Sequence, residues 1–443
     1  MQRIEIHNFG PIKDATIEIP KYLLLIGEQA SGKSTVAKLI YFFKSLREDF
    51  IQNIILMPQK KAFSSKNNFL IPTRAKFINY FGIPTFSENY NITFYYTESQ
   101  YVSIKWERPH ITISLSPDFF NQAFKRRLRN IRKKHYDILD KSMNLFTSAE
   151  FTAEISELSN DCFNVLEEDL FYVVADRSST VSFGHLFERV FSRELDNSLL
   201  HNSKIRNQSI EELLLRKFLD RIALLKDCFS NEHTLKHDTS FTKWIIRGMS
   251  DILKGNYSLQ YNQERISWGQ RGNNYVYLRN ASSGQQEVIR VLQDIVWVVR
   301  HNVNAFRIVE EPESHLFPLA QKKLVELLSA MVKNKINNSL VITTHSPYIL
   351  SSINNLLFAQ QVVNNFPELQ EAVQKEINQY SWIDSKDFRA YALSKSNTIY
   401  CRSILEKKTG MIAQNYLDSV SDEISKEFNQ IYQLYLSKLR EKK

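Results

Sequence analysis

The sequence contains few of the residues that interrupt regular structure. Its 443 residues include only 11 glycines and 11 prolines, which is below the average share of each, so long helices are expected. Each remaining glycine is therefore informative, and Gly27, Gly32 and Gly284 lie in the motifs described below.

The sequence also lacks features of secreted and membrane proteins. Its three cysteines, Cys162, Cys228 and Cys401, are far apart and odd in number, which fits neither a disulfide framework nor a zinc site. No run of 18 apolar residues is present, so no membrane span is expected. The N-terminal residues alternate between polar and apolar and contain no signal-peptide core. We therefore expect a cytoplasmic protein without membrane contact.

The net charge of +9 and the pI near 9.1 allow contact with nucleic acid or an acidic partner without requiring it. Seven basic residues lie between positions 125 and 134: Lys125, Arg126, Arg127, Arg129, Arg132, Lys133 and Lys134. On a helix they would surround most of the circumference. A solvated helix is the simpler interpretation, and contact with a phosphate backbone or an acidic partner is the alternative.

The alternation of apolar residues predicts an α/β fold with a mixed sheet and an additional antiparallel sheet. One domain is expected to combine residues 1–116 with residues 255–400. The intervening residues 117–254 read as a long and mostly helical insertion, interrupted by the strand-like "FYVVADRS". Residues 401–443 are expected to form a helical C-terminal tail.

A phosphate-binding loop follows the buried strand "YLLLIG". The segment "GEQASGKST" matches the pattern G-x-x-x-x-G-K-[ST] and precedes a helical stretch. Its glycines let successive backbone N–H groups face a phosphate, and the helix presents its positive N-terminus to the same anion. Lys33 is expected to reach the β- and γ-phosphates, and the Ser34 hydroxyl to bind Mg²⁺. The predicted nucleotide-binding residues here are Gly27, Glu28, Gln29, Ala30, Ser31, Gly32, Lys33, Ser34 and Thr35.

Two adjacent carboxylates end another apolar strand, in "FRIVEEPESHLFP". Alone, this segment could be an acidic helix start. Beside a phosphate-binding loop, Glu310 fits an Mg²⁺ ligand and Glu311 fits the group that polarises the attacking water.

Two further segments complete the pattern. In "ASSGQQE", small residues and a glutamine precede a helix, which predicts a second phosphate site at Ser282, Ser283, Gly284 and Gln285. In "VITTHSPYIL", His345 follows a buried strand, where a γ-phosphate sensor would be placed.

The order of these four motifs resembles the ABC-type ATPases, and more narrowly their SMC/RecF/OLD branch, over about residues 1–115 and 275–356. The resemblance implies that the α/β domain is a P-loop ABC-type ATPase domain that uses Mg²⁺ and ATP. It makes Ser282, Gly284 and Gln285 the signature, Glu311 the catalytic glutamate and His345 the switch histidine. Ser283 replaces the first glycine of the signature, and Glu310 stands where most relatives have aspartate. Gln59 is a candidate for the Q-loop glutamine.

In such ATPases the signature of one subunit covers the nucleotide of the other, so the resemblance implies a homo-oligomer with a head-to-tail ATP sandwich. OLD-type proteins carry a Toprim nuclease with an Asp-x-Asp pair, but this sequence contains no such pair and no His-Asn-His cluster. An OLD-like ATPase without a nuclease is similar to the ATPase subunits of anti-phage systems, PtuA of Septu and AriA of PARIS.

This similarity implies a sensor or switch subunit that controls a separate nuclease, of the HNH type (PtuB-like) or the Toprim type. The alternative is a stand-alone DNA-repair ATPase of the SMC/RecF kind that binds DNA directly. Arg177 in "ADRSS" fits either a structural ion pair or a role at the nucleotide site or an interface.

Overall fold

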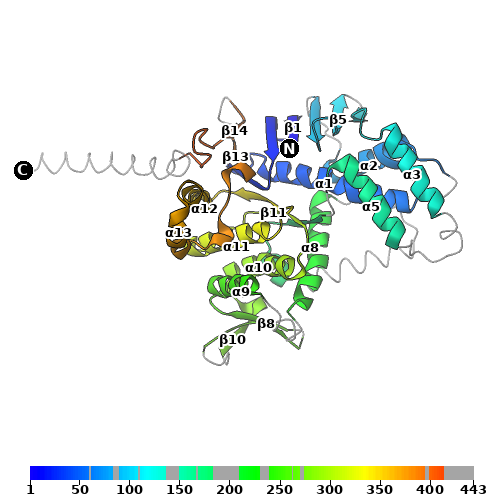
Figure 1. Cartoon of the computed structure of the whole chain (residues 1–443). Helices are drawn as coiled ribbons and strands as arrows, with labels where there is room; N and C mark the ends of the chain where they lie inside the picture. Colours follow the sequence, from blue (N-terminus) through cyan, green and yellow to red (C-terminus); the bar gives the residue numbers. More distant parts are fainter. Residues whose placement is uncertain are drawn as a thin grey trace, which may run out of the picture.

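The computed structural model describes residues 1–58, 61–82, 89–107, 110–135, 149–165, 168–182, 209–229, 239–261, 263–269, 274–394 and 399–413 (Figure 1). Two larger sheets and one small sheet lie among helices. The larger central sheet has the order β14 (Cys401–Ser403), β13 (Phe388–Leu393), β3 (Tyr22–Gly27), β12 (Ser339–Thr344), β11 (Ala305–Glu310) and β7 (Asp169–Val173). Its neighbouring strands are parallel except for the β13–β14 pair.

The second sheet is antiparallel and contains β2 (Ile12–Ile19), β1 (Gln2–Phe9), β4 (Tyr90–Tyr95), β5 (Tyr101–Glu107) and β6 (His110–Leu115) in that order. A small antiparallel sheet contains β10 (Asn274–Tyr277), β9 (Gln263–Trp268) and β8 (Asn256–Gln260). Together, the parallel and antiparallel sheets confirm the predicted α/β fold class.

The helices of eight or more residues that the structure describes are α1 (Lys33–Ile55), α2 (Ile71–Phe81), α3 (Gln122–Lys134), α5 (Ala149–Phe163), α8 (Ile210–Asp227), α9 (Ser240–Leu253), α10 (Ser283–His301), α11 (Pro318–Lys333) and α12 (Pro347–Asn365). Two shorter ones are α6 (Ser178–Ser182) and α13 (Gln370–Glu376).

The strands of the central sheet are apolar on both faces because helices cover both. Along β3, Leu23 and Leu25 belong to the hydrophobic cluster that contains much of α1 and the antiparallel sheet. Leu24, which points to the opposite face, belongs to the cluster that contains residues of α9, α10, α11 and α12. Helix α1 is therefore enclosed between two sheets, and its start is held at the edge of the central sheet.

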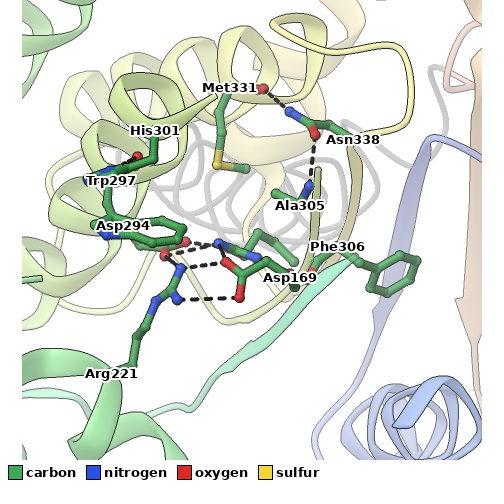
Figure 2. Close-up of polar contacts among 10 residues, drawn as sticks. Asp169, Arg221, Asp294, Trp297, His301, Ala305, Phe306, Met331 and Asn338 are labelled. Atoms are coloured by element: carbon green, nitrogen blue, oxygen red, sulfur yellow. Dashed lines mark hydrogen bonds and ion pairs between the residues drawn. The ribbon is translucent and has the colours of Figure 1, made fainter. Parts of the chain in front are cut away.

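Strand β7 corrects the predicted division of the chain. It lies inside the range 117–254, which the sequence assigned to a helical insertion, but it pairs in parallel with β11 in the central sheet. A largely buried cluster of charges supports this pairing. Arg307 of β11 contacts Asp169 of β7 at 2.6 Å and Asp294 of α10 at 2.5 Å. Arg221 of α8 contacts both aspartates (Figure 2). The middle of the chain thus contributes to the same sheet as the predicted site.

Burial works against the charge of Arg307, but Asp294 and Asp169 outweigh this effect and raise the pKa of its guanidinium. Two arginines and two aspartates compensate one another, which is the condition under which buried charges are tolerated.

Residues 401–413, the described part of the predicted helical tail 401–443, are not helical. Its first residues form β14, and Leu405 and Ile412 form an antiparallel bridge. Residues 414–443, the greater part of that prediction, lie outside the described residues.

Candidate functional site

The predicted site residues lie at the carboxyl edge of the central sheet. The phosphate-binding loop follows β3, Glu311 follows β11 and His345 follows β12. The register sets these ends level, since Glu310 pairs with Thr343 and Thr344 pairs with Ile26. Ligand sites of open α/β sheets are found outside this edge.

The loop between β3 and α1 has the geometry of an anion cradle. Gly32, the residue before α1, has a φ of 93°, in the left-handed region that favours glycine. A Cβ on it would come within 2.9 Å of Ile12 and 3.1 Å of the Tyr400 hydroxyl. A Cβ on Gly27 would clash with the main-chain oxygen of Leu393. Both glycines are therefore required by close packing as well as by the turn.

Lys33, the first residue of α1, closes the loop on itself. Its Nζ donates to the main-chain oxygens of Gly27 and Glu28, each at 2.8 Å. Burial lowers the pKa of the Lys33 ammonium, and the carboxylates Glu311, Glu313 and Glu310 counteract that shift. These carbonyl bonds can be exchanged for phosphate oxygens without leaving the ammonium unpaired.

Tyr400 supports the loop from the far end of the chain. Its hydroxyl donates to the main-chain oxygen of Ser31, and burial raises the pKa of this hydroxyl to about 12, so that it remains a donor at neutral pH. The sequence contains no motif that points to this residue, because 369 positions separate the partners.

Glu310 is the buried acid of the site. Only 7% of the residue is exposed, and its Oε1 has no hydrogen-bond partner. A carboxylate oxygen that is buried without a partner costs free energy, and a bound cation would remove that cost. The donor type suits Mg²⁺, which prefers oxygen ligands.

Glu311 contacts His345, the predicted switch histidine. Its φ of 42° is unusual for a residue with a side chain. Its Oε1 lies 3.1 Å from Nε2 of His345, and both side chains are partly exposed. The structure therefore brings the predicted catalytic glutamate and switch histidine into direct contact.

Glu313 was missed by the motif analysis although it connects the two strand ends. Its Oε1 accepts hydrogen bonds from the Thr344 hydroxyl and from the His345 main-chain N–H, each at 2.7 Å. This carboxylate fixes the backbone that presents His345. Its position two residues after Glu311 in "EEPE" was the available signal.

The signature segment begins α10. Ser282 forms a reciprocal capping box with Gln285, and Gln285 also donates to the main-chain oxygen of Leu253 at 2.7 Å. Ser282 and Ser283 are exposed. A Cβ on Gly284 would lie 2.5 Å from the main-chain oxygen of His315, in the loop after β11. Glycine at position 284 is thus required for contact with the loop that carries Glu311.

Arg177 forms the structural ion pair that one of the two interpretations expected. It is fully buried and contacts Glu287 of α10 at 3.2 Å. It also donates hydrogen bonds to the main-chain oxygens of Glu310 and Glu311, the two predicted acids of the site.

The family comparison agrees with this arrangement. Residues 1–350 match the family model described as an AAA ATPase domain. The chain belongs to this ATPase family. The predicted ATPase activity follows from membership of this family, and the family also implies nucleotide binding.

Similar solved structures include SMC head domains. One from Thermotoga maritima is 12% identical, with a TM-score of 0.33, and the match covers 79% of this chain and 90% of that chain. One with an extended coiled coil, bound to the C-terminal domain of ScpA derived from Pyrococcus furiosus, is 11% identical with a TM-score of 0.39, covering 96% of this chain and 100% of that chain. No curated protein matches the sequence.

Outside the predicted site, His135, Glu150 and Glu154 lie close enough together to hold a metal ion, a group that was not predicted. One ligand atom from each of His135, Glu150 and Glu154 lies within 4.8 Å of the others. The Lys134 ammonium already contacts the two glutamates at 2.8 and 2.6 Å, so their charge is compensated without a metal ion.

The predicted basic cluster lies on α3, and several of its residues have intramolecular partners. Arg127 pairs with Asp161, Lys134 pairs with Glu150 and Glu154, and Arg132 donates to main-chain oxygens of residues 57, 58 and 61.

Gln59, the Q-loop candidate, lies outside the described residues. None of the helices in the described ranges is long and apolar enough to cross a membrane.

Proposed function

We propose that the chain is an Mg²⁺-dependent ATP switch. The amides of residues 27–35 and the Lys33 ammonium hold the triphosphate. Ser34 and Glu310 hold Mg²⁺, which would neutralise charge on the phosphates. The observation that carries the proposal is the unpartnered Glu310 oxygen beside the Glu311–His345 pair, at the edge where the phosphate-binding loop ends.

Hydrolysis is assigned to Glu311. Its carboxylate polarises the attacking water and accepts a proton. Nε2 of His345 lies 3.1 Å from that carboxylate. A γ-phosphate offers His345 another acceptor, so its arrival frees Glu311 for water. In this proposal, Glu311 acts as a base only when His345 contacts the γ-phosphate.

We propose that two copies associate head to tail, with Ser282, Ser283, Gly284 and Gln285 of one copy on the nucleotide of the other. The exposed Ser282 and Ser283 at the start of α10 support this, because a helix N-terminus favours an anion and its side chains leave room for one. The hydrogen bonds of these residues run to Leu253 and within the capping box, away from their own phosphate-binding loop.

The biological role that we propose is a sensor and switch in an anti-phage complex of the Septu or PARIS kind, with a separate HNH or Toprim nuclease. Its support is the resemblance of motif order together with a sequence that has no Asp-x-Asp pair. Nucleotide-dependent closure would change the surface offered to the nuclease.

A stand-alone repair ATPase that binds DNA is the second candidate. Arg126, Arg129 and Lys133 are exposed on α3 and favour it. The ties of Arg127, Arg132 and Lys134 to other parts of the chain leave a smaller basic surface than the sequence suggested.

The two roles are separated by testing the purified chain. We expect ATP hydrolysis, no cleavage of DNA or RNA with Mg²⁺ or Mn²⁺, and phage resistance in cells only when a neighbouring nuclease gene is present. The Lys33→Ala variant is the inactive control. Tight, salt-dependent binding of DNA that is lost in an Arg126→Ala/Arg129→Ala/Lys133→Ala variant, without any need for a second gene, would favour the repair role.

A further inference from the structure

Arg177 lies at the junction of three elements. It follows β7, precedes α6 and has no exposed surface. Its Nε donates to the main-chain oxygen of Glu287 at 3.0 Å, and its Nη1 donates to the main-chain oxygens of Val174 at 3.0 Å and Glu310 at 2.7 Å. Its Nη2 donates to the main-chain oxygen of Glu311 at 3.1 Å. A single guanidinium thus connects α10 with the loop after β11.

The connection to α10 is made through Glu287, which is also buried. Its carboxylate accepts hydrogen bonds from the main-chain N–H groups of Arg177 at 3.0 Å and Ser178 at 2.9 Å. It also lies 3.2 Å from the Arg177 Nε. Glu287 is three residues beyond Gly284, so this contact is made in the turns of α10 that carry the signature.

The connection to Glu311 is made to a backbone with an unusual conformation. A residue with a side chain pays free energy for a φ of 42°. The Glu311 N–H donates to the Thr343 oxygen at 2.9 Å, and the Glu311 oxygen accepts from Arg177. The main-chain N–H and oxygen of Glu311 are therefore both hydrogen-bonded. The bond from Arg177 is the one that connects Glu311, through Glu287, to α10.

The charges around Arg177 favour its place between these elements. Burial lowers the pKa of its guanidinium, whereas Glu287, Glu313, Glu310 and Glu311 act in the opposite direction. A guanidinium has five N–H donors in a fixed plane, and four hydrogen bonds to main-chain oxygens use this geometry. A lysine could supply the charge but could not reach the same oxygens together.

We infer that Arg177 is a positioning residue that couples the signature to the catalytic glutamate of the same subunit. The inference rests on the proposed function, in which the signature touches the nucleotide of the other copy while Glu311 acts on its own. A shift of α10 on contact with the partner's nucleotide passes through Glu287 and Arg177 to Glu311. Occupation of one ATP site therefore controls hydrolysis at the other.

The test compares Arg177→Lys with Arg307→Lys. Both arginines are buried and paired with carboxylates, but Arg307 contacts Asp169 and Asp294, away from the Glu311 loop. For Arg177→Lys we expect kcat to fall about 10- to 100-fold, in line with the loss of charged hydrogen bonds, with the nucleotide Kd changed less than about threefold. For Arg307→Lys we expect lower thermal stability without a matching loss of kcat.

Glu287→Gln gives a second variant that retains the shape of the side chain. It should lower kcat with unchanged nucleotide Kd, and combined with Arg177→Lys it should lower kcat no further, because both break one connection. If kcat in Arg177→Lys and Glu287→Gln equals that of the wild type, the coupling is refuted while the ATPase assignment stands. If kcat falls no further in Arg177→Lys than in Arg307→Lys, Arg177 is merely structural. A wild-type chain without ATPase activity would instead refute the proposed function.

Discussion

Replacement of Lys33 by alanine tests the phosphate-binding loop, and the size of the effect follows from its two hydrogen bonds. Nζ donates to the main-chain oxygens of Gly27 and Glu28 at 2.8 Å. When nucleotide binds, these bonds are exchanged for bonds to phosphate. Because two carbonyl bonds are given up as the phosphate bonds form, only the difference contributes to affinity. One net hydrogen bond between charged groups contributes about 1.5–3 kcal/mol, so its loss weakens binding roughly 10- to 100-fold.

The matched control for Lys33→Ala is Lys44→Met on the same helix. Lys44 is also buried and contacts Glu168 at 3.1 Å, away from the loop. This variant should lose about 1–3 kcal/mol of unfolding free energy, because Glu168 is left without its partner, but retain the nucleotide affinity of the wild type. Denaturant titration measures the unfolding free energy, and isothermal titration calorimetry measures the nucleotide affinity. Wild-type affinity in Lys33→Ala, or equal losses in the two variants, would refute the assignment of the loop.

Three further results are expected. Glu310→Gln should raise the Mg²⁺ concentration needed for half-maximal ATPase about tenfold or more, because an amide oxygen replaces a charged ligand; an unchanged Mg²⁺ titration would exclude Glu310 as a ligand. Mixing Lys33→Ala with Gly284→Asp subunits should restore part of the ATPase activity, since one composite site in the mixed pair has both intact halves; co-assembled pairs without activity would indicate self-contained sites. The pKa of Glu264 is held at about 2, below its ordinary value of 4.5, because the hydrogen bonds and charge of Arg290 outweigh burial. Between pH 4.5 and 2 the unfolded chain therefore binds more protons, and about 3 kcal/mol of unfolding free energy should be lost as the pH falls through this range; denaturant titrations of Glu264→Gln should show a smaller acid slope, and the same slope as the wild type would contradict this cause.

Much of the site could be predicted because its motifs are local. The segment "GEQASGKST" specifies a strand, a turn and a helix within nine residues, and the structure has β3, a left-handed Gly32 and α1 there. Glu310 and Glu311 lie at the end of one buried strand, and His345 comes directly after another. Because neighbouring strands of a parallel sheet end at the same edge, these residues are expected at its carboxyl edge.

What could not be predicted depends on contacts between distant parts of the chain. Tyr400 and Ser31 are 369 positions apart, and Arg177 and Glu311 are 134 apart. The pattern at "FYVV" indicated a strand, but nothing local indicates that β7 would pair with β11 instead of remaining in a helical insertion. Glu313 accepts hydrogen bonds from Thr344 and His345, 31 and 32 positions further along the chain, so its role depends on the packing of two strand ends.

The measurement that most directly tests the switch is a comparison of nucleotide binding, hydrolysis and association in Glu311→Gln. The amide retains the shape of the carboxylate but cannot accept the proton of the attacking water. The account predicts ATP affinity near that of the wild type, a kcat at least about 100-fold lower, and a dimer that accumulates with Mg²⁺ and ATP in light scattering. Hydrolysis at the wild-type rate would contradict the assignment of Glu311, and with it the proposed link between the γ-phosphate, His345 and the active base.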